Sequence, residues 1–83
     1  MKVTVKLFAL LAQYLPPHAK ENQAELEVEE GASPGVIIDR LNMPRANCHL
    51  VLINGNYVPP SQLEQVALKE GDALAIWPPV AGG

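Results

Sequence analysis

Lys2-Val-Thr-Val-Lys-Leu-Phe8 decides the class of fold, because apolar and polar side chains alternate from Lys2 to Leu7. Its valines and its leucine face one way, whereas its lysines and its threonine face the other, which is typical of a β-strand with one buried face. Residues 24–29 alternate in the same way, with Leu26 and Val28 pointing inward and the glutamates pointing to water. We expect these two strands to pair through a hairpin-like connection.

The segments between and after these strands have helical character. Residues 9–15 lose the alternation and carry good helix formers, which predicts one or two helical turns that stop at Pro16-Pro17. The main helix is expected to start at Ser33-Pro34, because serine caps free backbone N–H groups and proline suits the first helical position. It should end near Met43, since Pro44 disfavours helical geometry before it. Its predicted apolar face consists of Val36, Ile37, Ile38 and Leu41.

The second half of the chain consists of short apolar runs separated by turn residues. Residues 49–53 are predicted to form a buried strand, and Asn54-Gly55 after it is a strong hairpin signal, because both residues tolerate positive φ. Tyr57-Val58 is then the return strand. Residues 73–77 form the last strand, which Pro78-Pro79 end because proline cannot donate to the ladder.

Runs of strands around one main helix predict an α+β fold. We expect a ubiquitin-like β-grasp: a mixed sheet of four to five strands with the helix across one face, and with the first and last strands adjacent at its centre. Since the chain has 83 residues, it is long enough for one domain only. That domain is expected to span residues 1–77, and residues 78–83 form a flexible C-terminal tail ending in Gly-Gly.

Composition narrows the classes of function. The formal net charge is −3, which argues against a nucleic-acid binder with a basic face. No apolar stretch is long enough to cross a bilayer and no secretory signal is visible, so cytoplasm is the expected location. The single cysteine, Cys48, is expected to be a buried structural thiol. With His18 and His49 it lacks metal-ligand spacing, so no metal site is predicted.

Four glutamates form a run of acidic side chains around the second strand: Glu25, Glu27, Glu29 and Glu30. A solvated strand face explains such a run, and a docking site for a basic partner is the alternative. We expect Lys2 and Lys6 to pair with these glutamates across the strands.

The C-terminal tail is the most unusual feature of the sequence. Pro78-Pro79 would project it stiffly from the domain, and glycines without Cβ atoms could thread a narrow channel in a partner. A carboxylate at Gly83 is a poor acyl donor until adenylation gives it AMP as a leaving group, after which sulfur or an amine can attack the carbonyl. A frayed terminus without a role is the alternative.

Residues 77–83, Trp-Pro-Pro-Val-Ala-Gly-Gly, closely resemble the terminus of the MoaD/ThiS family of ubiquitin-like sulfur carriers. The likeness is greatest to the MoaD branch, the small subunit of molybdopterin synthase. Residues 3–8, 52–55 and 68–72 resemble the family's first strand, central hairpin and approach to the last strand. Residues 9–15 depart from it, because the family often carries charges there.

The resemblance implies a reaction carried out with partners. An E1-like adenylyltransferase of the MoeB/ThiF type would adenylate Gly83 with its own ATP and magnesium, and a sulfur donor would convert the adenylate to a thiocarboxylate. The large synthase subunit, of the MoaE type, would hold the molybdopterin precursor that accepts the sulfur. The chain itself would bind no cofactor and would act as a sulfur-donating co-substrate, not catalytic alone.

The resemblance also implies roles for individual residues. Gly83 carries the reacting carboxylate, while Gly82, Ala81 and Val80 thread the partner's active site. The residues expected to dock outside are Phe8, Leu52, Trp77, Pro78 and Pro79. For Phe8, Leu52 and Trp77, burial in the core is an equally good interpretation.

Three alternatives share the predicted fold. A carrier for thiamine, cysteine, tRNA thiolation or a tungsten–pterin cofactor would use the same terminal chemistry. A ubiquitin-like protein modifier would form an isopeptide bond from Gly83 to substrate lysines. A plain interaction module would leave its tail idle.

Overall fold

The structure is a computed structural model and describes residues 1–79. Five strands form its sheet: β1 (Lys2–Leu7), β2 (Gln23–Glu27), β3 (Leu50–Ile53), β4 (Asn56–Tyr57) and β5 (Ala73–Trp77). The helices are α1 (Pro34–Arg40) and three 3₁₀ helices, η1 (Ala9–Tyr14), η2 (Arg45–Asn47) and η3 (Pro60–Gln62). Residues 9–15 were predicted to be helical, and η1 confirms this as a 3₁₀ helix.

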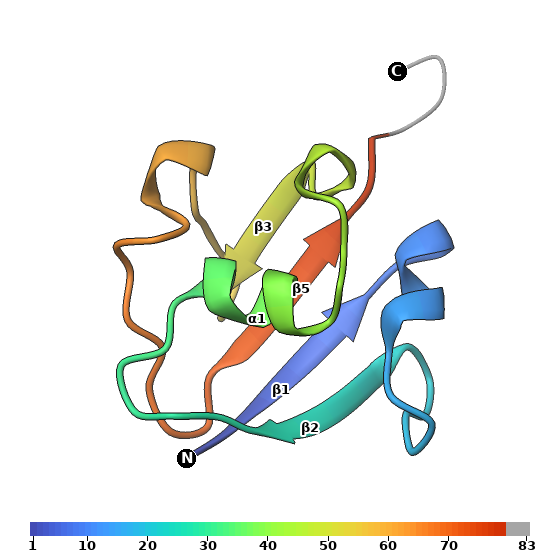
Figure 1. Cartoon of the computed structure of the whole chain (residues 1–83), viewed down its shortest axis with the longest axis horizontal. Helices are drawn as coiled ribbons and strands as arrows, with labels where there is room; N and C mark the ends of the chain where they lie inside the picture. The colour runs from blue at the N-terminus through green and yellow to red at the C-terminus, as the bar shows by residue number, and fades with distance from the viewer. Residues whose placement is uncertain (80–83) are drawn as a thin grey trace.

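The sheet is mixed, with the strand order β2-β1-β5-β3-β4. The central pair, β1 and β5, is parallel, and the other three pairs are antiparallel. Figure 1 shows β1 and β5 side by side, with α1 crossing in front of the sheet. The predicted β-grasp, with its first and last strands at the centre, is therefore confirmed.

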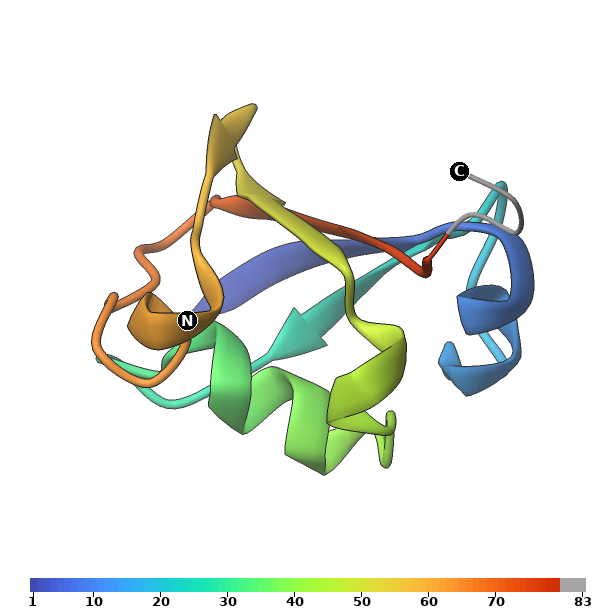
Figure 2. The ribbon, with the colours of Figure 1, turned by 90° about the horizontal axis from the view of Figure 1, so that it is seen from above.

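The core lies between the sheet and α1. Val5 and Leu7 of β1 and Leu74 and Ile76 of β5 have no exposed surface, because α1 covers this side of the sheet. Figure 2 shows α1 on one side of the sheet only. The alternation read from the sequence thus assigns the inward side chains correctly, and it leaves the other side of the sheet uncovered.

Two local sequence signals form the expected contacts. The Ser33 hydroxyl accepts a hydrogen bond from the Val36 N–H at 3.3 Å, which caps the start of α1. Asn54 and Gly55 both adopt positive φ, 51° and 84°, in the turn between β3 and β4. The return strand is Asn56–Tyr57, one residue earlier than predicted. The Val58 N–H still bonds to the Val51 carbonyl at 2.8 Å, and Pro59 after it has no N–H to continue the pairing.

The predicted end of α1 near Met43 is wrong, since the helix ends at Arg40. The physical reason is Asn42, which adopts a φ of 62° and reverses the chain. The Met43 N–H then bonds back to the Ile38 carbonyl at 3.0 Å, which satisfies an acceptor at the helix end. Asn42, rather than Pro44, is therefore the stop signal.

The predicted apolar face of α1 is correct except at one position. Ile37 and Ile38 are fully buried and Leu41 is partly buried, whereas Val36 is 47% exposed. Position 36 lies about 100° around the helix from position 37, so it faces solvent when Ile37 faces the sheet.

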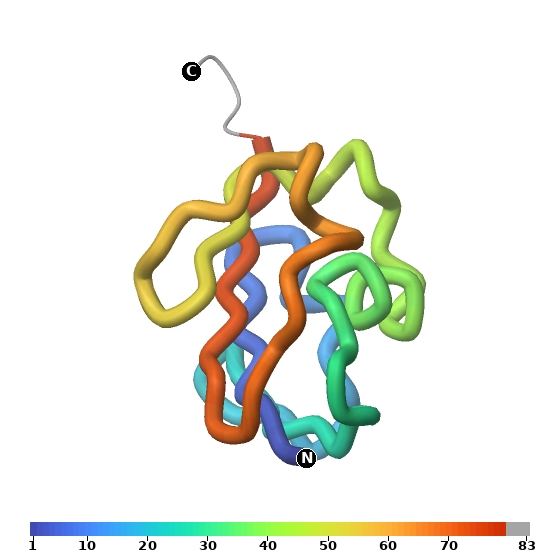
Figure 3. Tube along the Cα trace, turned by 90° about the vertical axis from the view of Figure 1, so that its left-hand side faces the viewer, coloured from blue at the N-terminus to red at the C-terminus, as the bar shows by residue number. Residues whose placement is uncertain are grey.

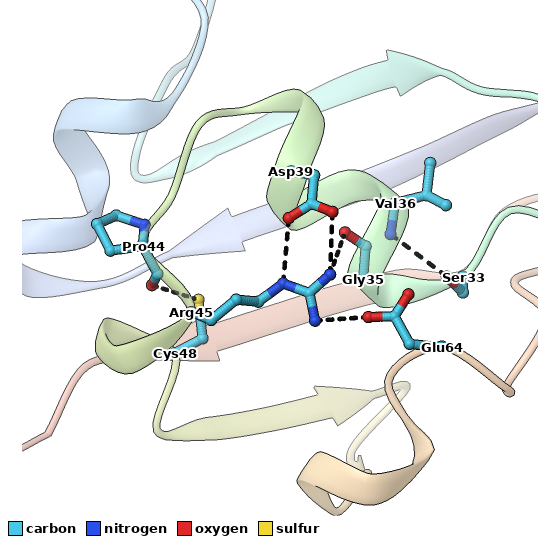
Figure 4. Close-up of polar contacts among 8 residues, drawn as sticks. All are labelled: Ser33, Gly35, Val36, Asp39, Pro44, Arg45, Cys48 and Glu64. Atoms are coloured by element: carbon cyan, nitrogen blue, oxygen red, sulfur yellow. Dashed lines mark hydrogen bonds and ion pairs between the residues drawn. The ribbon is translucent and has the colours of Figure 1, made fainter.

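A polar cluster of Asp39, Arg45 and Glu64 joins three segments around α1 (Figure 4). The Arg45 guanidinium donates to both carboxylate oxygens of Asp39, at 3.1 and 3.0 Å, and also pairs with Glu64. This bidentate hydrogen bond holds the pKa of Asp39 below its usual value. The cluster therefore ties η2 and the segment after η3 to the helix.

The segment between η3 and β5 returns the chain along the whole length of the molecule (Figure 3). Two backbone hydrogen bonds attach it to the start of α1: Gly35 N–H to the Leu63 carbonyl at 2.9 Å, and Leu68 N–H to the Ala32 carbonyl at 2.8 Å. Because of this return, β5 runs in the same direction as β1.

Replacing Ile37 by alanine should destabilise the protein by about 2–4 kcal/mol, because a buried side chain would leave a cavity in a thin core. Val36→Ala is the matched control on the neighbouring exposed position and should cost less than about 1 kcal/mol. Urea unfolding followed by circular dichroism measures both. Equal losses would contradict the orientation of α1.

Replacing Arg45 by methionine should lower stability near pH 7 by less than about 1 kcal/mol, since the ion pairs are exposed. Because the folded pKa of Asp39 is depressed below its usual 3.8, its contribution is present above that pH and is lost as pH falls through the folded pKa. The difference from wild type should therefore shrink below about pH 4. Urea unfolding across this pH range measures it.

Arg40→Met is the matched control for this pH dependence. The Arg40 guanidinium donates to the Glu27 backbone carbonyl at 2.7 Å, and that acceptor does not titrate. Any stability that Arg40→Met loses should stay constant over the same pH range. A constant loss for Arg45→Met as well would contradict the role assigned to Asp39.

Candidate functional site: the outer face and the start of the tail

The start of the tail is fixed at one edge of the sheet. Since β1 and β5 are parallel, Phe8 after β1 and Trp77 at the end of β5 reach the same edge. Their rings stack with centroids 4.3 Å apart and planes inclined by 5°. The Phe8 N–H bonds to the Ile76 carbonyl at 3.2 Å, and the His49 N–H bonds to the Trp77 carbonyl at 2.9 Å. The last residue before Pro78-Pro79 is therefore held from both sides.

The side of the sheet that faces away from α1, here called the outer face, carries an apolar patch. The patch consists of Phe8, Leu50, Leu52, Tyr57, Ala75 and Trp77. Strand register aligns these residues: Leu50 lies opposite Trp77, and Leu52 lies opposite both Ala75 and Tyr57. All six are half-buried or exposed in the isolated chain, so they form an accessible surface.

The structure brings three of the predicted docking residues, Phe8, Leu52 and Trp77, together on the outer face. None of them belongs to the buried core, and each is half-buried. Pro78 is half-buried and Pro79 is exposed at the start of the tail. Val80, Ala81, Gly82 and Gly83 lie outside the described residues, so the roles given to them stay predictions, as does docking itself.

Three accessible apolar residues were not predicted. Leu10 on η1 is 78% exposed and Tyr57 is 57% exposed, while Leu50 completes the row beside Trp77. Leu10 lies in an apolar run that the sequence gives no reason to place outside the core. The alternation within residues 49–53 does place Leu50 and Leu52 on the same face, and that signal could have found Leu50.

The expected pairing of Lys2 and Lys6 with the glutamates of β2 is correct only in part. Register places Lys2 opposite Glu27, but the two form no ion pair within 4.0 Å over residues 1–79, and Lys6 faces no glutamate. Glu27 instead pairs with the ammonium group of Met1 at 2.9 Å, and this hydrogen bond lowers the pKa of Glu27. Register places Lys6 opposite Gln23, which is neutral, and Thr4 opposite Glu25. Neither lysine has a carboxylate within 4.0 Å in this part of the chain.

Cys48 is a buried structural thiol, as predicted. It is 9% exposed, and its Sγ lies 3.5 Å from the Pro44 carbonyl (Figure 4). Burial raises the pKa of this thiol, which disfavours the reactive thiolate. Over residues 1–79, no group of three side chains could hold a metal ion, and no helix is long and apolar enough to span a membrane.

Solved structures with the same architecture come from several organisms. SAMP1 from Haloferax volcanii is 28% identical with a TM-score of 0.69, and the match covers 100% of both chains. Molybdopterin converting factor subunit 1, as named in Pyrococcus furiosus, is 27% identical with a TM-score of 0.65 over 95% of this chain and 98% of its own. No curated protein matches the sequence.

A further solved structure is the complex of subunits 1 and 2 of the molybdopterin-converting factor from Helicobacter pylori. The matched chain is 22% identical with a TM-score of 0.62, and both chains are covered fully, so it supports the fold alone. The family model of the ThiS family matches residues 5–83, which is nearly the whole chain. The chain therefore belongs to the ThiS family and has the ubiquitin-like β-grasp fold of the ThiS and MoaD sulfur carriers.

Proposed function

We propose that this protein is a sulfur carrier whose Gly83 carboxylate is adenylated and then converted to a thiocarboxylate. The observation that carries the proposal is the fixed start of the tail. The stacked Phe8 and Trp77 hold the end of β5 beside an accessible apolar patch, and the sequence then continues through two prolines to Gly82-Gly83. A partner that covers the patch would receive the tail at a defined position.

The proposed chemistry has three steps. The Gly83 carboxylate attacks the α-phosphorus of ATP, a mixed anhydride with AMP forms, and pyrophosphate leaves. A persulfide sulfur of the donor then attacks the carbonyl carbon and AMP leaves. A thiol of the donor attacks the S–S bond of the resulting acyl disulfide, which releases the Gly83 thiocarboxylate and leaves the donor as a disulfide. ATP and magnesium would be held by the activating partner, which needs the metal to neutralise the phosphates.

We infer two protein partners from the family and its chemistry. The first is an E1-like adenylyltransferase of the MoeB/ThiF type, which would perform the activation together with a sulfur donor. The second is a large synthase subunit of the MoaE type. The neighbour from Helicobacter pylori is a complex of two subunits, which supports the expectation of a partner that binds this fold.

Molybdopterin synthesis is the pathway that we favour. The ending Trp77-Pro-Pro-Val-Ala-Gly-Gly83 is the MoaD type of terminus, and one neighbour at 27% identity is named as subunit 1 of a molybdopterin converting factor. The family match and the other neighbours fit a carrier for thiamine or another thiolated product equally well.

Protein modification is the second candidate, because SAMP1, a small archaeal modifier protein, is 28% identical over its full length. In that case a lysine amine, instead of sulfur, would attack the Gly83 adenylate and release AMP. Both candidates share the activation step and differ only in the nucleophile.

Incubation with the adenylyltransferase encoded in the same genome, ATP, magnesium and a sulfur donor tests the proposal. We expect pyrophosphate release that depends on this protein, and replacement of one Gly83 oxygen by sulfur in the intact mass. Conjugates on substrate lysines would favour the modifier. A tail that is never adenylated would contradict both.

Gly82→Val should block activation and leave the fold intact, because a β-branched side chain would not pass a channel built for glycine. Pyrophosphate exchange should fall by at least about 100-fold, with an unchanged unfolding midpoint. One residue appended after Gly83 should have the same effect. Wild-type exchange rates for either variant would show that the tail is idle.

Phe8→Ala should free the indole of Trp77, the single tryptophan of the chain, from its stacking partner. We expect its fluorescence to shift to longer wavelength and stability to fall by about 1–2 kcal/mol. Leu10→Ala is the control, because Leu10 on η1 is 78% exposed. It should change neither the fluorescence spectrum nor the stability. An unshifted spectrum in Phe8→Ala would contradict the stacked arrangement.

A further inference from the structure

The apolar patch has a positive charge at one side, and this charge comes from Lys6. Strand register places Lys6 next to Ala75, in the same row across the sheet as Leu52 and Tyr57. Phe8 lies two residues further along the same side of β1. Lys6 therefore borders the patch directly, and it is already half-buried in the isolated chain.

The charge of Lys6 is not neutralised within the described part of the chain. Its cross-strand neighbour on β2 is Gln23, and its neighbour on β5 is an alanine. No carboxylate of residues 1–79 lies within 4.0 Å of its ammonium group, and the acidic Glu27 is already paired with the ammonium of Met1. The glutamates of β2 lie in the rows of Thr4 and Lys2 instead.

Lys2 lies on the same strand and the same face as Lys6, but its surroundings differ. It lies four residues from Lys6, which is about 13 Å along a strand. Its row contains Glu27 rather than apolar residues, and it is more exposed than Lys6. A partner seated on the patch would cover Lys6 and leave Lys2 in water.

We propose that the partner that docks on the outer face places a carboxylate opposite Lys6. This inference rests on the proposed function, since it describes the surface of the activating enzyme that receives the tail. Covering the patch removes water from the Lys6 ammonium, and a buried charge without a partner strongly disfavours association. A carboxylate beside the apolar contact restores the lost interaction and fixes the register of docking.

The test measures the KM for this protein in pyrophosphate exchange with the adenylyltransferase of the same genome. Lys6→Glu should raise KM by at least about tenfold, and Lys6→Met should raise it by about three- to tenfold, while kcat stays unchanged. Lys2→Glu makes the same change in net charge on the same strand and should alter KM by less than about twofold. Raising the ionic strength should increase the KM of the wild-type protein more than the KM of Lys6→Met.

The outcomes separate this inference from the function on which it rests. A KM for Lys6→Met that equals or falls below that of wild type would overturn the carboxylate, because the methionine keeps an apolar stem and lacks the charge. Equal effects of Lys2→Glu and Lys6→Glu would also overturn it, since they would indicate long-range attraction only. A wild-type protein that is never adenylated would overturn the proposed function itself.

Discussion

The parallel pairing of β1 with β5 is the constraint on which the rest of the structure depends. The two strands are far apart in sequence, yet they supply four fully buried side chains of the core, Val5, Leu7, Leu74 and Ile76. Parallel strands end at the same edge, so the pairing also places Phe8 against Trp77 where the tail begins. The strand pairing that forms the core therefore also positions the site.

Because side chains alternate along these strands, the residues that stabilise the core differ from those that are accessible to a partner. The inward side chains pack against α1, while their neighbours along the chain form the outer face, because successive residues of a strand point to opposite sides. Changes on the two faces should therefore act on different measurements: unfolding for the inner face, association for the outer. The half-buried aromatic pair Phe8 and Trp77 is the exception, since it belongs to the outer face and also holds the strand end.

The sequence predicts features that depend on neighbours along the chain. The alternation of β1, the Ser33 cap and the Asn54-Gly55 turn are local, and the structure has all three. The end of α1 was missed although its signal is also local. Asn42 ends the helix because a left-handed residue lets Met43 bond back to Ile38, and asparagine after the last apolar position is a known stop signal that Pro44 obscured.

The sequence predicts which residues belong to the candidate site, but it does not predict how the fold brings them together. Phe8, Leu52 and Trp77 were expected to dock or to be buried, and only strand register places them together on the uncovered face. The pairing of Glu27 with the Met1 ammonium, instead of with a lysine of β1, depends on where the chain end lies in three dimensions. Leu10 lies in an apolar run, and the turn at Ala9, which adopts a φ of 53°, directs Leu10 to solvent while Leu11 is buried.

If Gly83 carries the chemistry, then its carboxylate cannot also select the pathway. A glycine carboxylate that is adenylated offers the same carbonyl to sulfur for a pterin, to sulfur for thiamine, or to a lysine amine. Discrimination between these acceptors must therefore come from the surface that a partner contacts before the tail reaches its active site. On this chain the surface that we propose for this contact is the apolar patch with Lys6 at its side. Its charge and shape, rather than Gly82-Gly83, should decide which enzymes the carrier meets.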